Sequence, residues 1–221
     1  MAPALKLGVL ASGRGSNLQS IIDAIEAKRL DAELRIVISD KSDALALERA
    51  EKHGLQARFI DPKAFAGREE YDRELVRVFK EHQVELVALA GFMRIMTPLF
   101  IRSFPNRVLN IHPALLPAFP GLRVQRAAVR YAVKFSGATV HIVDEGVDTG
   151  PIVIQAVVSV LEGDSEEALA ERILKEEHKI YPQAIQWFAQ GRVKVADRRV
   201  VIEDASRPEG STWFNPPLET K

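Results

Sequence analysis

The chain has 221 residues, 47% of them hydrophobic, and its 30 basic side chains balance 30 acidic ones. A zero net charge argues against a general nucleic-acid binder, which usually carries a basic excess. The absence of cysteine excludes disulfides, thiolate metal sites and a cysteine nucleophile. Because no stretch approaches the roughly 20 apolar residues of a membrane helix and the first residues do not resemble a signal peptide, we expect a soluble, cytoplasmic protein.

Strand-like and helix-like segments alternate through the first half of the chain. Apolar runs predict strands, and apolar residues at helical spacing predict the helices between them. The expected strands are 7–11, 34–38, 57–60 and 84–90, and the expected helices are 17–27, 44–53 and 69–82. This alternation predicts an α/β fold with a Rossmann-like, mostly parallel twisted sheet and helices on both faces. Ligands of such sheets bind at the carboxyl ends of the strands.

The second half of the chain has a different pattern. We expect strands at 108–111, 139–143 and 152–160, a helix at 125–133 and a terminal hairpin of 192–195 with 200–203. A long helix is expected at 165–190, capped by Asp164 or Ser165, and Pro182 should kink or divide it. Residues 206–221 are rich in proline, glycine and serine, which indicates a loosely ordered tail.

A glycine-rich loop, S-G-R-G-S-N at 12–17, joins the first predicted strand to the first helix. Its glycines let the backbone turn sharply, and the helix N-terminus supplies N–H donors and a positive dipole end. The loop lacks the third glycine of a dinucleotide fingerprint and the lysine of a P-loop. It predicts an anion cradle best suited to phosphate, although an ordinary tight turn before a helix has the same composition.

Two polar side chains end the strand predicted at 108–111. Strand alternation puts Asn110 and His112 on one face, where the amide can donate to a developing oxyanion and the imidazole can donate or move a proton. Asp148, in the turn 144–151, could orient His112 or accept a proton from an attacking amine. The alternatives are a histidine satisfied by backbone and an aspartate that only shapes its turn.

The segment A-G-F-M-R-I-M at 90–96 follows the buried strand. Met93, Ile95 and Met96 predict a soft apolar wall, beside the cation of Arg94, on which a flat heteroaromatic ring could lie. Core filling is the commoner use of methionine and remains the alternative. With no cysteine and no close histidine–carboxylate pair at metal spacing, we predict no metal site.

The motifs G-R-G-S-N-L-Q, A-G-F-M-R-I, N-I-H-P-A-L-L-P-A-F-P-G and V-D-T-G-P-I occur in this order between residues 6 and 191. Together they resemble the phosphoribosylglycinamide formyltransferases, a folate-dependent formyltransferase family. The resemblance implies transfer of the formyl group of 10-formyltetrahydrofolate to the primary amine of N1-(5-phosphoribosyl)glycinamide, in purine biosynthesis. It implies small-molecule partners only, no metal, no nucleic acid and no membrane, and either a monomer or a homodimer.

The resemblance also assigns roles to residues of this chain. The catalytic trio maps onto Asn110, His112 and Asp148; the phosphate loop onto Gly15, Ser16 and Asn17; and a substrate-binding acid onto Glu177. The folate-binding positions are Met93, Arg94, Ile95, Met96, Val143 and Asp144. We expect one domain over 1–205, with 1–105 as the phosphate- and nucleotide-binding half and 106–205 as the catalytic and folate-binding half. Arg123 departs from the family, which usually has histidine there.

Three rival functions share parts of this pattern. Methionyl-tRNA formyltransferase carries an additional C-terminal domain, and formyltetrahydrofolate deformylase carries an additional N-terminal one; we expect neither here. A catalytically inert nucleotide-binding module would explain the phosphate loop but has no need of Asn110, His112 and Asp148.

Overall fold

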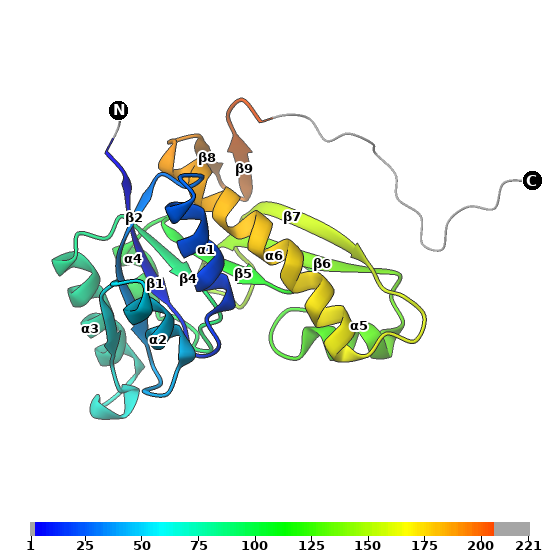
Figure 1. The fold of residues 1–221 in the computed structure, drawn as a ribbon, viewed down its shortest axis with the longest axis horizontal. Helices are drawn as coiled ribbons and strands as arrows, with labels where there is room; N and C mark the ends of the chain where they lie inside the picture. Colours follow the sequence, from blue (N-terminus) through cyan, green and yellow to red (C-terminus); the bar gives the residue numbers. More distant parts are fainter. Residues whose placement is uncertain (1–2, 206–221) are drawn as a thin grey trace, which may run out of the picture.

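The computed structural model describes residues 3–205. At its centre is a seven-stranded sheet in the order β3-β2-β1-β4-β5-β6-β7 (Figure 1). The strands β1 to β5 pair in parallel, whereas β6 pairs antiparallel with both β5 and β7. The predicted Rossmann-like, mostly parallel sheet is therefore confirmed. The strands are β1 (Leu5–Leu10), β2 (Ala32–Ser39), β3 (Ala57–Phe59), β4 (Leu86–Leu89), β5 (Val108–His112), β6 (Phe135–Ile142) and β7 (Ile152–Ser159).

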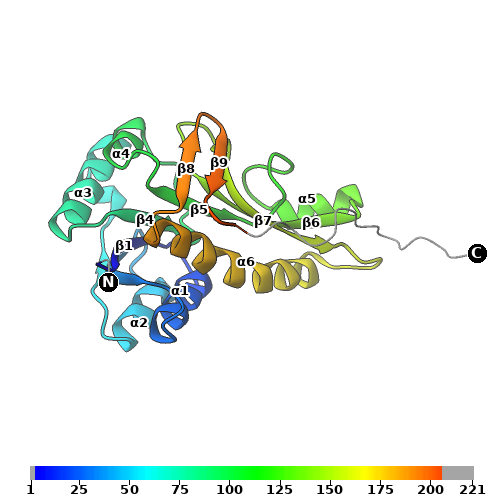
Figure 2. The same cartoon turned by 90° about the horizontal axis from the view of Figure 1, so that it is seen from above.

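Helices cover both faces of the sheet (Figure 2). The helices are α1 (Ser16–Glu26), α2 (Leu45–Lys52), α3 (Arg68–Glu81), α4 (Pro98–Ser103), α5 (Val124–Tyr131) and α6 (Glu166–Ala189), with a 3-10 turn at Pro62–Ala64. On one face, α1, α2 and α6 bury their apolar residues against the sheet; on the other, α3 and α4 do so through an aromatic cluster of Phe79, Phe100 and Phe104. Each face thus has its own core.

Two features of the helices differ from the sequence prediction. Pro182 lies inside a continuous 24-residue α6, so the expected division of this helix is wrong. A proline removes one backbone donor, and the apolar face that α6 buries, which includes Ile173, Ile180 and Ile185, maintains the helix across that gap. The short helix α4 was not predicted.

The N-cap of α6 and the hairpin that follows this helix agree with the prediction. Ser165 is the N-cap, and its side chain accepts a hydrogen bond from the Ala168 N–H, as one of the two expected caps. The expected terminal hairpin is present as β8 (Val193–Ala196) and β9 (Arg199–Ile202), which form a separate two-stranded sheet. The predicted loose tail, 206–221, lies outside the described residues.

The strand order places three loops at one edge of the sheet. Since β1, β4 and β5 are parallel neighbours, the segments that follow them lie together at their carboxyl ends. The order reverses between β1 and β4, which is the topological switch point where ligands bind in such sheets. No helix within residues 3–205 has the length and apolar character of a membrane span.

Candidate active site

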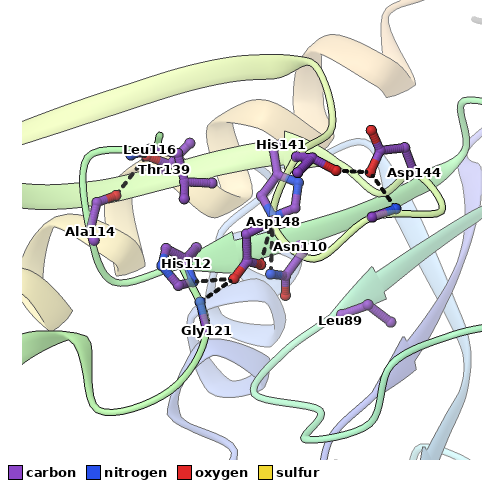
Figure 3. Close-up of polar contacts among 12 residues, drawn as sticks. Leu89, Asn110, His112, Ala114, Leu116, Gly121, Thr139, His141, Asp144 and Asp148 are labelled. Atoms are coloured by element: carbon purple, nitrogen blue, oxygen red, sulfur yellow. Dashed lines mark hydrogen bonds and ion pairs between the residues drawn. The ribbon is translucent and has the colours of Figure 1, made fainter. Parts of the chain in front are cut away.

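Asn110 and His112 lie in β5, which pairs antiparallel with β6. Asn110 lies opposite His141, and His112 lies opposite Thr139. The Asn110 Nδ2 atom is 3.1 Å from the His141 Nε2 atom (Figure 3), and because an amide nitrogen can only donate, Nε2 accepts this hydrogen bond. Alternation along the strand predicted at 139–143 puts His141 on the same face as Thr139 and Val143, but it does not reveal which residue of β5 His141 faces.

Asp148 lies in the turn between β6 and β7 and reaches both histidines (Figure 3). Its Oδ2 atom is 3.4 Å from the His112 Nδ1 atom and accepts a 2.8 Å hydrogen bond from the Gly121 N–H. Its Oδ1 atom is 3.5 Å from the His141 Nε2 atom. The fold therefore brings Asp148 close to Asn110 and His112, from which it is remote in the sequence.

The environment of Asp148 favours its charged form. Burial raises the pKa of this carboxyl, but its interactions with His141, with the Gly121 N–H and with His112 outweigh burial, so the pKa lies below its ordinary value. A carboxylate that stays negative at neutral pH can neutralise a proton held on an adjacent imidazole. Among residues 3–205, no cluster of three His, Asp or Glu side chains is arranged to hold a metal ion.

The second ring nitrogen of His112 fixes its tautomer. The Nε2 atom is 2.8 Å from the Phe119 carbonyl oxygen, which can only accept, so Nε2 carries a hydrogen. In the neutral ring Nδ1 is then unprotonated, and a second proton added there faces Asp148. His112 is 4% exposed, so little water competes for that proton. The ring is thus placed to hold or release one proton at Nδ1.

The proline-rich loop after His112 is anchored by β6 and β7. The Thr139 hydroxyl donates to the Ala114 carbonyl at 2.7 Å and accepts from the Leu116 N–H at 3.1 Å. The Gln155 side-chain amide donates to the Leu116 carbonyl and to the Thr139 hydroxyl, both at 2.9 Å. These bonds hold the loop that carries the Phe119 carbonyl.

We predict that Thr139→Val destabilises the protein by about 2 kcal/mol, because valine keeps the shape but leaves the buried Leu116 N–H and Ala114 carbonyl without their hydroxyl partner. The free energy of unfolding, measured in denaturant, tests this. Thr139→Ser is the control, since serine retains the hydroxyl. A valine variant as stable as the serine variant would contradict the anchoring role.

The phosphate-loop prediction concerns the turn between β1 and α1. Gly15 is the N-cap of α1 with a φ of 68°, and a Cβ atom there would lie 2.8 Å from the Ala46 Cα atom, so only glycine fits. The helix α1 begins at Ser16, which is half-buried and borders a hollow of about 360 Å³ that Arg29 and Arg49 also line. Backbone donors at a helix N-terminus beside two guanidinium groups suit an anion.

Asn17 connects this loop to α6. Its Nδ2 atom donates a buried 2.7 Å hydrogen bond to the Glu177 Oε2 atom, and its Oδ1 atom is buried without a partner among the described residues. Burial raises the pKa of Glu177 above its ordinary value, although the Asn17 hydrogen bond partly opposes this. One turn later on α6, the Tyr181 hydroxyl donates to the Leu89 carbonyl, at the end of β4, and to the Leu109 carbonyl, near the start of β5. The substrate-acid and phosphate-loop positions therefore adjoin each other.

We predict that Glu177→Gln stabilises the unliganded protein at neutral pH but raises the KM for the phosphorylated substrate about tenfold or more, the effect of losing one hydrogen bond to a charged group. A raised folded-state pKa means that the native protein holds its proton to higher pH than the unfolded chain, so wild-type stability falls as pH rises from about 4.3 through that pKa. Thermal unfolding from pH 4 to 8 and steady-state kinetics test both parts. A variant whose stability has the wild-type pH dependence would contradict the first.

The predicted folate-binding positions fall in two loops. After β4, Gly91 has a φ of 76°, and Met93 and Ile95 are 64% and 55% exposed. Met96 is buried in the core beneath α3, so the expected wall of three apolar side chains is wrong. The Met96 side chain packs with the apolar residues of this core and leaves only Met93 and Ile95 exposed. Arg94 is half-buried, with its guanidinium over the Tyr71 ring.

Val143 and Asp144 begin the second of these loops, directly after β6. The Val143 N–H bonds the Val108 carbonyl at 2.8 Å. Asp144 accepts hydrogen bonds from the Gly146 N–H at 3.1 Å and the Thr149 hydroxyl at 2.6 Å, which shape the turn that presents Asp148. Arg123 is exposed at the N-cap of α5, and nothing in the structure explains its replacement of histidine.

Comparisons with known proteins show which family the chain belongs to. A family model described as formyl transferase matches residues 5–185. The chain is 42% identical over 204 residues to phosphoribosylglycinamide formyltransferase of Escherichia coli, covering 92% of this chain and 96% of that protein. It is 50% identical over 194 residues to the trifunctional purine biosynthetic protein adenosine-3 of Drosophila pseudoobscura, but spans only 14% of that protein and 87% of itself. A crystal structure of glycinamide ribonucleotide transformylase 1 from Symbiobacterium toebii superposes with a TM-score of 0.91 at 50% identity, covering 92% of this chain and 96% of that one.

Proposed function

This chain belongs to the formyl transferase family, and we infer from its relatives and its site that it is a phosphoribosylglycinamide formyltransferase of purine biosynthesis. The reaction moves the formyl group of 10-formyltetrahydrofolate to the primary amine of N1-(5-phosphoribosyl)glycinamide. The observation that carries the inference is the convergence of Asn110, His112 and Asp148 at the sheet edge where the loop after β1 offers an anion cradle.

Acyl transfer to an amine requires groups that stabilise an oxyanion and move one proton. The attacking nitrogen forms a bond to the formyl carbon, and negative charge collects on the formyl oxygen. Asn110 and the imidazolium of His112 stabilise that charge, and Asp148 holds the imidazolium. The ammonium proton leaves with the help of Asp148 and water and reaches N10 of the departing tetrahydrofolate as its bond to the carbon breaks. No covalent enzyme intermediate is needed.

Binding of the phosphorylated substrate is assigned to the loop after β1. The N–H groups around Gly15, Ser16 and Asn17 receive the phosphate, with the dipole of α1 directed at it. Glu177 and the unpartnered Asn17 Oδ1 atom then accept hydrogen bonds from hydroxyl or amide groups of the same substrate.

The folate co-substrate is assigned to the two loops that flank Asn110. The exposed apolar side chains of Met93 and Ile95 fit one face of a flat pterin, and Arg94 and Met96 contribute backbone groups. The turn that starts at Val143 and Asp144 covers the other side. A carrier held between these loops presents its formyl group to the residues of β5.

The division of the chain proposed from sequence follows these assignments only in part. Residues 1–105 contribute the phosphate loop and also the Met93 to Met96 segment, and 106–205 contribute the catalytic trio. Since β4 pairs with β5 across the boundary, one sheet carries both halves. We propose a cytoplasmic enzyme that acts on small molecules, as a monomer or homodimer, with neither a metal nor a nucleic-acid partner.

A two-substrate assay tests the function. Purified protein is mixed with 10-formyltetrahydrofolate, with N1-(5-phosphoribosyl)glycinamide, or with both, and absorbance is followed. A spectral change that needs both compounds is expected. Release of formate from the folate alone would indicate a deformylase, and no change in any mixture would indicate a binding module.

A further inference from the structure

The segment between β4 and α4, residues 91–97, is neither helix nor strand. On the side of β1, it is tied to Ser12: the Met93 N–H donates to the Ser12 hydroxyl at 2.9 Å, and the Ser12 N–H donates to the Gly91 carbonyl at 3.1 Å. A segment without a strand ladder depends on such contacts for its conformation. The contacts to residues 94–97 come from the helix α3.

The first turns of α3 hold the remainder of the segment at residues 94, 95 and 97. The Arg68 guanidinium donates to the Ile95 carbonyl at 2.7 Å. The Arg94 guanidinium lies 5.1 Å from the centre of the Tyr71 ring. The Asp72 Oδ2 atom accepts a 2.6 Å hydrogen bond from the Thr97 N–H. Positions 68, 71 and 72 share one helical face, so α3 contacts the segment as a unit.

Two of these side chains, Asp72 and Tyr71, are almost fully buried. Asp72 is 4% exposed, and ionised carboxylates are rarely buried because water must be removed from them. Its hydrogen bond from the Thr97 N–H lies directly before Pro98, where α4 begins. Tyr71 is 1% exposed, and its hydroxyl has no partner among the described residues, so the ring alone accounts for its contact with Arg94.

We propose that Asp72 and the ring of Tyr71 are positioning residues for the folate co-substrate. They touch neither the reacting atoms nor the phosphate loop; they fix the backbone of residues 94–97 and the direction of the Arg94 side chain. The inference rests on the proposed function, because it concerns affinity for the folate. Its consequence is selective: losing these contacts weakens folate binding and leaves the phosphorylated substrate unaffected.

Asp72 is tested by two substitutions, only one of which retains an acceptor oxygen. Asp72→Ala removes the acceptor of the Thr97 N–H, and we expect at least a tenfold rise in the KM for 10-formyltetrahydrofolate and in the Kd for tetrahydrofolate measured by calorimetry. Asp72→Asn retains an oxygen at that place, and we expect both constants within about threefold of wild type. The KM for N1-(5-phosphoribosyl)glycinamide should stay within twofold in both variants.

Tyr71 offers a second contrast that does not depend on Asp72 variants folding. Tyr71→Phe keeps the ring under Arg94 and removes the unpartnered hydroxyl, so the Kd for tetrahydrofolate should remain that of wild type. Tyr71→Leu keeps an apolar side chain but removes the aromatic face, and the same Kd should rise about threefold or more. If Phe and Leu were equivalent, the ring would have no positioning role.

The matched control is Asp164→Ala, remote from the segment. Asp164 also accepts a backbone hydrogen bond, from the Leu161 N–H at 2.8 Å, and pairs with Arg172. Its loss should lower the thermal midpoint without changing any folate constant. Asp72→Ala and Tyr71→Leu variants with wild-type folate constants, or with equal rises in both KM values, would overturn the positioning role alone. Wild-type protein that binds no tetrahydrofolate would overturn both this inference and the proposed function.

Discussion

The substitutions Asn110→Ala and His112→Ala are each expected to lower turnover by at least about a hundredfold, equivalent to about 3 kcal/mol of lost transition-state stabilisation. Asn110 is the amide donor at the end of β5, and His112 is the ring whose protonated form faces Asp148. Because both groups act mainly on the developing oxyanion, kcat should fall with little change in either KM. Steady-state kinetics with both substrates varied is the measurement.

The stability of these variants must be measured beside their kinetics. His112→Ala leaves the Phe119 carbonyl and the Asp148 carboxylate without their imidazole partner, at a cost of about 1–3 kcal/mol. The control is His82→Ala, because His82 also bonds a backbone carbonyl, that of Val78, but lies at the end of α3. It should lose some stability and keep its turnover. Folded His112→Ala protein with near-normal turnover would refute the assigned role.

The pattern of the sequence predicted most of the sheet because burial imposes a simple period. The strand β4 is buried at all four residues and β1 at five of six, as expected for strands covered on both faces, and their short apolar runs do not have the period of an amphipathic helix. The helix α3 shows its buried face at regular spacing. The helix α4 has only six residues and begins at Pro98, so its one buried phenylalanine gave no period to detect.

The convergence of the candidate site depended on two kinds of information. Alternation along β5 was enough to place Asn110 and His112 on one face. Which side chain of β6 would meet them depended on the antiparallel register, and that register put His141 opposite Asn110 and within 3.5 Å of Asp148. Likewise, the contacts of Asp72 and Tyr71 with residues 94–97 join elements whose spacing no local pattern encodes. Local periodicity predicts which face of a strand or helix a side chain occupies, whereas the residues that it contacts on other elements depend on tertiary packing.

The substitution Asp148→Asn is expected to reduce turnover on the order of ten-thousandfold, as neutralising the carboxylate beside a catalytic histidine does elsewhere. Asparagine can still accept the Gly121 N–H, so the turn should keep its conformation. What it lacks is the negative charge between His112 and His141. Asp61→Asn, a change at a surface residue that accepts the Lys63 N–H, is the control and should leave turnover unchanged.

The pH dependence of the Asp148→Asn variant separates a charge effect from a structural one. The lowered pKa of Asp148 means that the carboxylate stabilises the native state above about pH 3.9, and that this contribution is lost as pH falls through the folded-state pKa; the variant should therefore lose less stability in acid than wild type. In the variant no carboxylate favours the protonated imidazole, but a higher proton concentration can replace that effect. The ratio of wild-type to variant turnover should therefore shrink as the pH is lowered from about 8 to about 5. A deficit of constant size across that range would mean that Asp148 acts only by shaping its turn.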